Sequence, residues 1–123
     1  MTYHAIAIDG PSGAGKSSLA RKVAEAYGFI YVDTGAMYRA VGLKVKNSGI
    51  DMNDEAAMAA MLADTDIDFV NGDIILDGVI VNKEIRANDM SMMASNVSAL
   101  PAVRAKLVEL QRKMGQTKSI IMD

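Results

Sequence analysis

A glycine-rich stretch near the start of the chain has the residue types and the spacing of a phosphate-binding loop. It fits the pattern G-x-x-x-x-G-K-[ST] and comprises Gly10, Pro11, Ser12, Gly13, Ala14, Gly15, Lys16 and Ser17. Glycine lets a backbone approach a ligand closely, and the N–H groups of such a loop bind anions at the positive end of a helix. Lys16 adds a mobile positive charge, and the Ser17 hydroxyl suits Mg²⁺. The alternative is an ordinary glycine-rich turn, which needs neither three glycines and a proline nor a Lys-Ser pair.

The elements around this loop are those that a nucleotide-binding loop requires. An apolar run predicts a strand over residues 3–9, with the continuous apolarity of a central parallel strand covered on both faces. A helix follows over about 17–27, with Gly28 placed as its C-cap. A second strand over 29–32 and a helix over about 36–46 continue the alternation. The sequence therefore predicts a doubly wound α/β fold, a parallel sheet with helices on both faces.

A different pattern follows between residues 50 and 90. Asp51 or Asn53 can cap a helix over about 54–62, after which short apolar runs predict strands over 67–70, 74–76 and 79–81. The runs are separated by Asn71-Gly72 and Asp77-Gly78, which are strong hairpin signals. An antiparallel meander does not continue a parallel sheet, so we expect an inserted lobe over about 50–90.

The last part of the chain predicts two helices and a third parallel strand. The helices cover about 89–98 and 101–114, with Pro101 at the first position of the second helix and Gly115 ending it. The strand covers 119–122, and Asp123 stands at its carboxyl end. Proteins with this loop place a Mg²⁺-associated carboxylate at such a position. The loop after Asp123 would lie at the site, so we expect the chain to be part of a longer protein.

A second candidate stretch for chemistry runs from Asp33 to Arg39, at the carboxyl end of the second strand. Arg39 could form a forked contact with a phosphate, and Asp33 and Thr34 present oxygens at the sheet edge. The residues alone leave an alternative open, in which Asp33 or Thr34 merely caps the helix and Arg39 is a solvated surface charge.

Together these stretches resemble bacterial cytidylate kinase. The resemblance covers the whole chain and rests on the loop sequence GPSGAGKS, the run DTGAMYR at 33–39, the β insert, and the run SNVSALPAVR at 95–104. It implies transfer of the γ-phosphoryl group of ATP to CMP or dCMP, with Mg²⁺. The insert separates this family from the adenylate and shikimate kinases, which share the loop.

The resemblance also implies roles for individual residues. The ATP phosphates would be held by Gly10 through Ser18, including Ser18 itself, and Mg²⁺ by Ser17 and Asp123. The catalytic residues would be Lys16, Asp33, Arg39 and Asp123. The acceptor CMP would be bound by Thr34, Tyr38, Arg39, Ser95 and Arg104. The family continues past the position of Asp123 with Gly-Arg-Asp and a lid that carries further arginines, so we expect this chain alone to turn over poorly.

Composition limits the remaining possibilities. The 123 residues suggest one domain, here a C-terminally truncated P-loop kinase domain, and half of them are hydrophobic, which argues against disorder. The net charge of −2 gives no basic excess for nucleic acid, and no apolar run reaches a membrane span or a signal peptide. We expect a cytoplasmic monomer that binds neither nucleic acid nor membrane. Two alternatives to a cytidylate-type kinase are a non-catalytic ATP-binding module and another small-molecule P-loop kinase.

Overall fold

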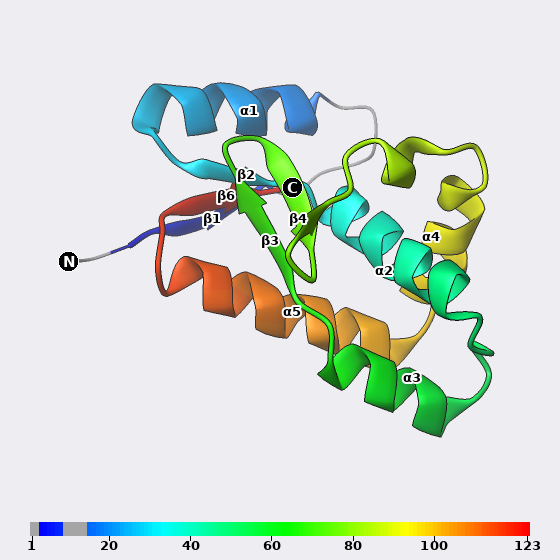
Figure 1. The fold of residues 1–123 in the computed structure, drawn as a ribbon. Helices are drawn as coiled ribbons and strands as arrows, with labels where there is room; N and C mark the ends of the chain where they lie inside the picture. Colours follow the sequence, from blue (N-terminus) through cyan, green and yellow to red (C-terminus); the bar gives the residue numbers. More distant parts are fainter. Residues whose placement is uncertain (1–2, 9–14) are drawn as a thin grey trace.

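A three-stranded parallel sheet forms the centre of the fold. The computed structural model describes residues 3–8 and 15–123. Strands β1 (Ala5–Ala7), β2 (Ile30–Val32) and β6 (Ile120–Met122) are arranged in the order β1-β6-β2, and β6 runs parallel to both neighbours (Figure 1). The predicted α/β class is therefore confirmed, as is the third parallel strand.

The first strand does not take its predicted central position in the sheet that the described residues form. In the described sheet β1 lies at an edge and its three residues are exposed, whereas β6 lies in the middle with Ile120 and Ile121 fully buried. An apolar run predicts a strand, but it does not show which other strands lie beside it. The position of a strand in a parallel sheet is decided by the crossover connections, which are non-local.

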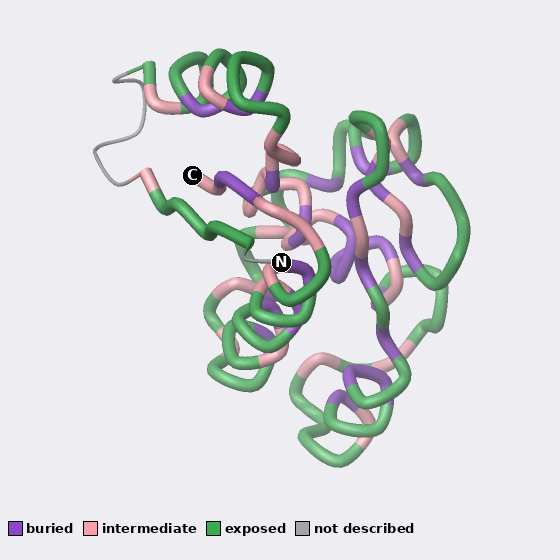
Figure 2. Tube along the Cα trace, turned by 90° about the vertical axis from the view of Figure 1, so that its left-hand side faces the viewer, coloured by how far each residue is buried: buried purple, intermediate pink, exposed green. Residues whose placement is uncertain are grey.

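Helices cover both faces of the parallel sheet, as predicted. On one face, α1 (Lys16–Tyr27) buries Ala20 and Ala24 against Ile121, and the buried side of α1 faces the strands in Figure 2. On the other face, α2 (Thr34–Ser48) and α5 (Pro101–Gly115) contribute to a much larger core that includes Val32 and Ile120.

The residues between α2 and α5 form a second, antiparallel sheet. Strands β3 (Ile67–Val70), β4 (Asp73–Leu76) and β5 (Val79–Ile80) are joined by two-residue turns. Positive φ values of 52° and 85° at Asn71 and Gly72, and of 50° and 83° at Asp77 and Gly78, identify both turns as type I′. The hairpin predictions are therefore confirmed.

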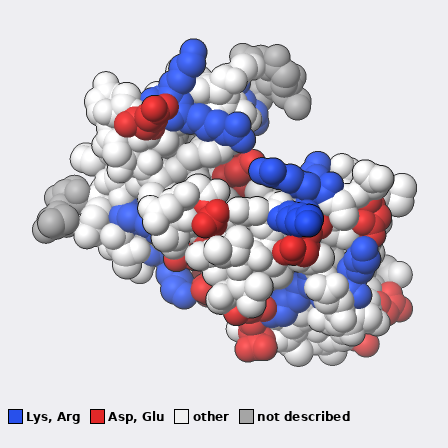
Figure 3. Space-filling model, turned by 45° about the horizontal axis from the view of Figure 1, so that its top comes forward, with Lys and Arg blue, Asp and Glu red and all other residues white. Residues whose placement is uncertain are grey.

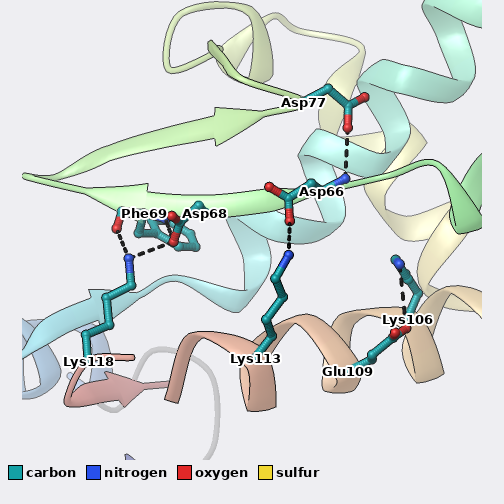
Figure 4. A network of polar contacts seen from close by, with 8 residues as sticks. All are labelled: Asp66, Asp68, Phe69, Asp77, Lys106, Glu109, Lys113 and Lys118. Atoms are coloured by element: carbon teal, nitrogen blue, oxygen red, sulfur yellow. Dashed lines mark hydrogen bonds and ion pairs between the residues drawn. The ribbon is translucent and has the colours of Figure 1, made fainter. Parts of the chain in front are cut away.

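This antiparallel sheet is fastened to the rest of the molecule by apolar and polar contacts. Its buried residues, such as Phe69 and Ile74, belong to the same core as α2 and α5. Lys118 donates to Asp68 Oδ1 at 2.7 Å and to the Phe69 carbonyl at 2.8 Å, and Lys113 contacts Asp66 at 3.2 Å (Figure 4). The sheet is thus held against α5 and the segment that leads into β6.

The remaining elements are α3 (Glu55–Ala63), the short 3₁₀ helix η1 (Glu84–Arg86) and α4 (Met90–Ser98). Asp54 caps α3 by accepting a hydrogen bond from the Ala57 N–H at 3.1 Å, so the prediction of Asp51 or Asn53 as the cap is wrong. Asp51 instead accepts from the Asn53 N–H at 2.9 Å, which forms a turn before the helix.

Helix ends were otherwise close to their predicted positions. Gly28 ends α1 with a φ of 69°, as predicted, and Pro101 occupies the start of α5, which ends at Gly115. Helix α2 begins two residues earlier than predicted because Asp33 caps it. No helix within 3–8 and 15–123 has the length and apolarity to span a membrane.

Candidate functional site

Asp123 accepts hydrogen bonds from the side chains of three elements at the carboxyl end of the parallel sheet. The Ser17 hydroxyl, from the first turn of α1, donates to Asp123 Oδ2 at 2.5 Å. The Tyr31 hydroxyl, from β2, donates to the same oxygen at 2.7 Å. The Thr34 hydroxyl, at the start of α2, donates to the backbone carbonyl oxygen of Asp123 at 2.5 Å. The structure therefore brings together Ser17, Thr34 and Asp123, all singled out from the sequence.

Tyr31 is the centre of a further set of contacts. Burial raises the pKa of Tyr31 to about 12, and the hydrogen bond to the Asp123 carboxylate adds to this rise. The guanidinium carbon of Arg21, on α1, lies 5.3 Å from the centroid of the tyrosine ring, which is the geometry of a cation–π contact. The phenol is thus held between a carboxylate at its hydroxyl and a cation over its ring.

A cavity of about 890 Å³ opens next to this cluster. Its walls come from α1, β2, the start of α2, the antiparallel sheet and η1, and its charged lining residues are Arg21, Asp33, Arg39 and Arg86. Figure 3 shows basic side chains on both sides of the hollow beneath α1. Three arginines against one aspartate make the described lining attractive to an anion.

Arg39 and Asp33 both line the cavity and both have partners within the protein. Arg39 donates from Nη1 to the Ile85 carbonyl at 3.3 Å and from Nη2 to the Ser91 hydroxyl at 3.0 Å. Asp33 accepts from the Ala36 N–H at 3.1 Å and so caps α2. Asp33 therefore caps the helix and lines the cavity as well, and Arg39 is a half-buried residue of the cavity wall rather than a solvated surface charge.

The other residues singled out from the sequence lie in several places. Gly10, Pro11, Ser12, Gly13 and Ala14 fall outside the described residues. Gly15, with a φ of 78°, directly precedes α1, Lys16 begins that helix, and Ser18 is exposed on it. Tyr38 packs against the large core, and neither Ser95 on α4 nor Arg104 on α5 is among the described residues that line the cavity.

The donor atoms at Asp123 fit a magnesium ion that is carried by a nucleotide. Mg²⁺ prefers oxygen ligands and is usually held by one or two protein groups together with substrate phosphates and water. The Ser17 hydroxyl and the Asp123 carboxylate supply two such oxygens in direct contact. Within the described ranges no cluster of three or more acidic, histidine or cysteine side chains could hold a metal ion alone. This donor set suits a metal that arrives with its ligand.

Sequence reasoning missed the cavity residues Tyr31, Arg21 and Arg86. Tyr31 could have been found, because it lies two residues before Asp33 at the end of a strand, and alternate strand residues share a face. Arg21 and Arg86 gave no such signal. Their place in the wall depends on how α1 and η1 pack around the sheet, which is a non-local property.

Comparisons with known proteins identify the family. The family model for cytidylate kinase matches residues 6–123. Similar proteins include the cytidylate kinases of Clostridioides difficile, 48% identical over 96% of this chain and 55% of the relative, and of Acholeplasma laidlawii, 48% identical over 100% and 55%. That of Caldicellulosiruptor saccharolyticus is 48% identical over 96% and 54%. The chain spans about half the length of the curated relatives it matches. Because the family model extends over nearly all of its residues, the chain belongs to the cytidylate kinase family.

Proposed function

We propose that this chain is part of a nucleoside-monophosphate kinase that transfers the γ-phosphoryl group of ATP to CMP or dCMP, giving ADP and CDP or dCDP. The observation that carries the proposal is the arginine-lined cavity beside the Ser17–Asp123 pair, in a chain of the cytidylate kinase family. An anionic acceptor in that cavity would lie next to the oxygens that suit the metal of Mg-ATP.

In this proposal the residues around α1 bind the donor. The loop over residues 10–15, with Lys16, Ser17 and Ser18, binds the ATP phosphates. Ser17 and Asp123 hold Mg²⁺, which neutralises charge on the phosphates when it is bound. Lys16 places a positive charge on the outer phosphates, where negative charge spreads during transfer.

The acceptor is bound on the opposite wall of the cavity. Arg39 forms a forked contact with the CMP phosphate, exchanging its bonds to Ile85 and Ser91 for stronger charge-assisted ones. Asp33 accepts a proton or a hydrogen bond from the acceptor. Thr34 and Tyr38 also bind the acceptor in this proposal, although neither is among the described residues that line the cavity. Ser95 and Arg104 reach the acceptor only if α4 and α5 move toward it, since neither lines the cavity as described.

We extend the proposal to organisation and surroundings. Residues 1–123 form one kinase domain, in which about 50–90 make the lobe that binds the nucleoside monophosphate. The net charge of −2 supports a protein that does not bind nucleic acid, and we propose a cytoplasmic monomer.

The first experiment is a calorimetric titration of the chain with CMP, UMP, AMP and shikimate, each with and without Mg-ATP. We expect a clear preference for CMP, because the acceptor wall is built from described residues of this chain. Binding of ATP with no preference among acceptors would contradict the proposed substrate and would favour a non-catalytic ATP-binding module.

A second experiment separates binding from turnover. Phosphoryl transfer requires positively charged groups around both substrates. An arginine that stabilises the charge of the transition state raises the rate on the order of 10³–10⁵-fold. We therefore expect the 123-residue chain to bind both substrates but to form CDP slowly. Steady-state CDP formation at a rate typical of kinases, about 1–100 s⁻¹, would contradict this expectation and would show that residues 1–123 are sufficient for catalysis.

A further inference from the structure

The Asp123 carboxylate receives two hydroxyl hydrogen bonds, and the two donors differ in what they can do next. Ser17 is itself placed to contact a metal, so its bond to Asp123 can be exchanged when a metal ion arrives. Tyr31 approaches the same Oδ2 atom from β2 at 2.7 Å. A phenol hydroxyl is not a usual Mg²⁺ ligand, so this bond can persist with the metal bound.

Tyr31 is also the better fixed of the two donors. Its ring packs against the cluster of Ala20, Ala24 and Ile121 beneath α1. Arg21 covers the ring, with its guanidinium carbon 5.3 Å from the centroid. A donor whose own side chain is held by packing can fix the orientation of the group that it contacts.

We propose that Tyr31 is a positioning residue that holds the carboxylate of Asp123 in the orientation needed to contact the metal of Mg-ATP. Carboxylates that bind metals are themselves hydrogen-bonded by neighbouring groups, and loss of such a neighbour typically lowers metal affinity or activity 10- to 100-fold. The inference rests on the proposed function, because it takes Mg-ATP as the ligand of this site.

The test is Tyr31→Phe, which removes the hydroxyl and keeps the ring. ATP affinity is measured by calorimetry with Mg²⁺ and again in EDTA, in the protein at the full length that its gene encodes. We expect the gain in ATP affinity that Mg²⁺ provides to fall about 10-fold, and the affinity in EDTA to stay unchanged. The Mg²⁺ concentration that half-saturates turnover should rise by a similar factor.

Two further variants isolate the role of the hydroxyl. Tyr27→Phe removes the hydroxyl of a tyrosine on α1 that is 73% exposed, and it should leave both affinities unchanged. In an Asp123→Asn background, Tyr31→Phe should add no further loss of the Mg²⁺-dependent gain, because the two residues act through one contact.

An unchanged Mg²⁺-dependent gain in Tyr31→Phe would overturn the inference. So would an equal loss of affinity in EDTA, since that would assign the tyrosine a general structural role. CDP formation by the unsubstituted protein tests the proposed function separately. Formation of CDP together with an unaffected Tyr31→Phe variant would refute only the inference. Loss of the Mg²⁺-dependent gain in a protein that forms no CDP would refute only the proposed function.

Discussion

The two faces of the parallel sheet are built differently. Beneath α1 only Ala20, Ala24 and Ile121 are fully packed together in the described structure, and small side chains let the helix lie close to the strands. The other face belongs to a continuous core that joins α2, α4, α5 and the antiparallel sheet. The cluster around Asp123 lies at the carboxyl end of the sheet, with Ser17 contributed by α1 and Thr34 by α2. The comparison indicates that most of the buried apolar core lies on one face, whereas the candidate site takes residues from both faces: Ser17 and Arg21 from α1, and Arg39 from α2.

This division has a consequence for local stability. A segment with few buried apolar contacts opens at a lower free energy than the global unfolding reaction. A ligand that binds only the closed segment then stabilises it by mass action. We therefore expect the α1 face to depend on bound nucleotide more than the α5 face does.

The largest expected effect comes from removing a side chain of the large core. Leu107, on α5, is 1% exposed. Leu107→Ala should lower the free energy of unfolding by about 2–5 kcal/mol, because it removes transfer energy and leaves a cavity. The matched change beneath α1 is Val23→Ala, at a partly buried residue, which should cost about 1 kcal/mol. Denaturant unfolding measures both, and equal losses would contradict the comparison.

The converse prediction concerns function. Lys16→Ala, at the start of α1, should lower turnover by about 10²–10³ while leaving the free energy of unfolding nearly unchanged. The control is Lys22→Ala, an exposed position on the same helix. Full turnover in Lys16→Ala would argue against a phosphoryl-transfer role for the α1 face, and so would an equal loss in the control variant.

A third prediction tests how closely the larger face is packed. A Cβ atom added at Gly42, on α2, would lie 2.9 Å from the Cβ of Met93 on α4. Gly42→Ala should therefore destabilise the protein by about 1–3 kcal/mol, although alanine is the better helix former by about 1 kcal/mol. Gly115→Ala, where the nearest neighbouring atom lies 3.8 Å away, should be neutral or mildly stabilising. A more stable Gly42→Ala variant would show that α2 and α4 have room to separate.

The smallest expected effect is a pH dependence at the rim of the same face. A hydrogen bond from Lys46, at 2.6 Å, lowers the pKa of the exposed Asp89 carboxyl below its usual value. The pair therefore stabilises the fold above the ordinary aspartate pKa of about 4, and this contribution is lost as the pH falls through the lowered pKa. Urea unfolding of wild type and Asp89→Asn should differ slightly at pH 7 and converge near pH 2. A difference that persists at pH 2 would assign the effect to packing.

The parts of the fold that the sequence predicts well are those set by local chemistry. Asn71-Gly72 and Asp77-Gly78 predict two hairpins because a type I′ turn needs two residues with positive φ. The helices follow from apolar periodicity and from Gly28 and Pro101 at their ends. The edge position of β1 could not be predicted, since strand order depends on how distant segments pack.

The candidate site likewise contains some residues that the sequence identifies and others that it does not. The residue types and spacing of the glycine-rich loop, Ser17 and Asp123 predict a site for phosphate and Mg²⁺ from the sequence alone. Tyr31 and Arg21 are ordinary residues of a strand and a helix, and their relevance arises only where β2, β6 and α1 meet. The cap of α3 was misplaced because several neighbouring residues have suitable side chains and only the backbone conformation selects Asp54.

Arg39 illustrates how hydrogen bonds in the free protein affect the thermodynamics of binding. Its two contacts, to the Ile85 carbonyl and the Ser91 hydroxyl, already restrict a side chain with many rotamers. Ordering such a side chain on binding costs about 0.5–1.5 kcal/mol. In this protein part of that entropy is lost during folding, so an anion that binds Arg39 replaces two existing hydrogen bonds and does not have to order a freely rotating side chain.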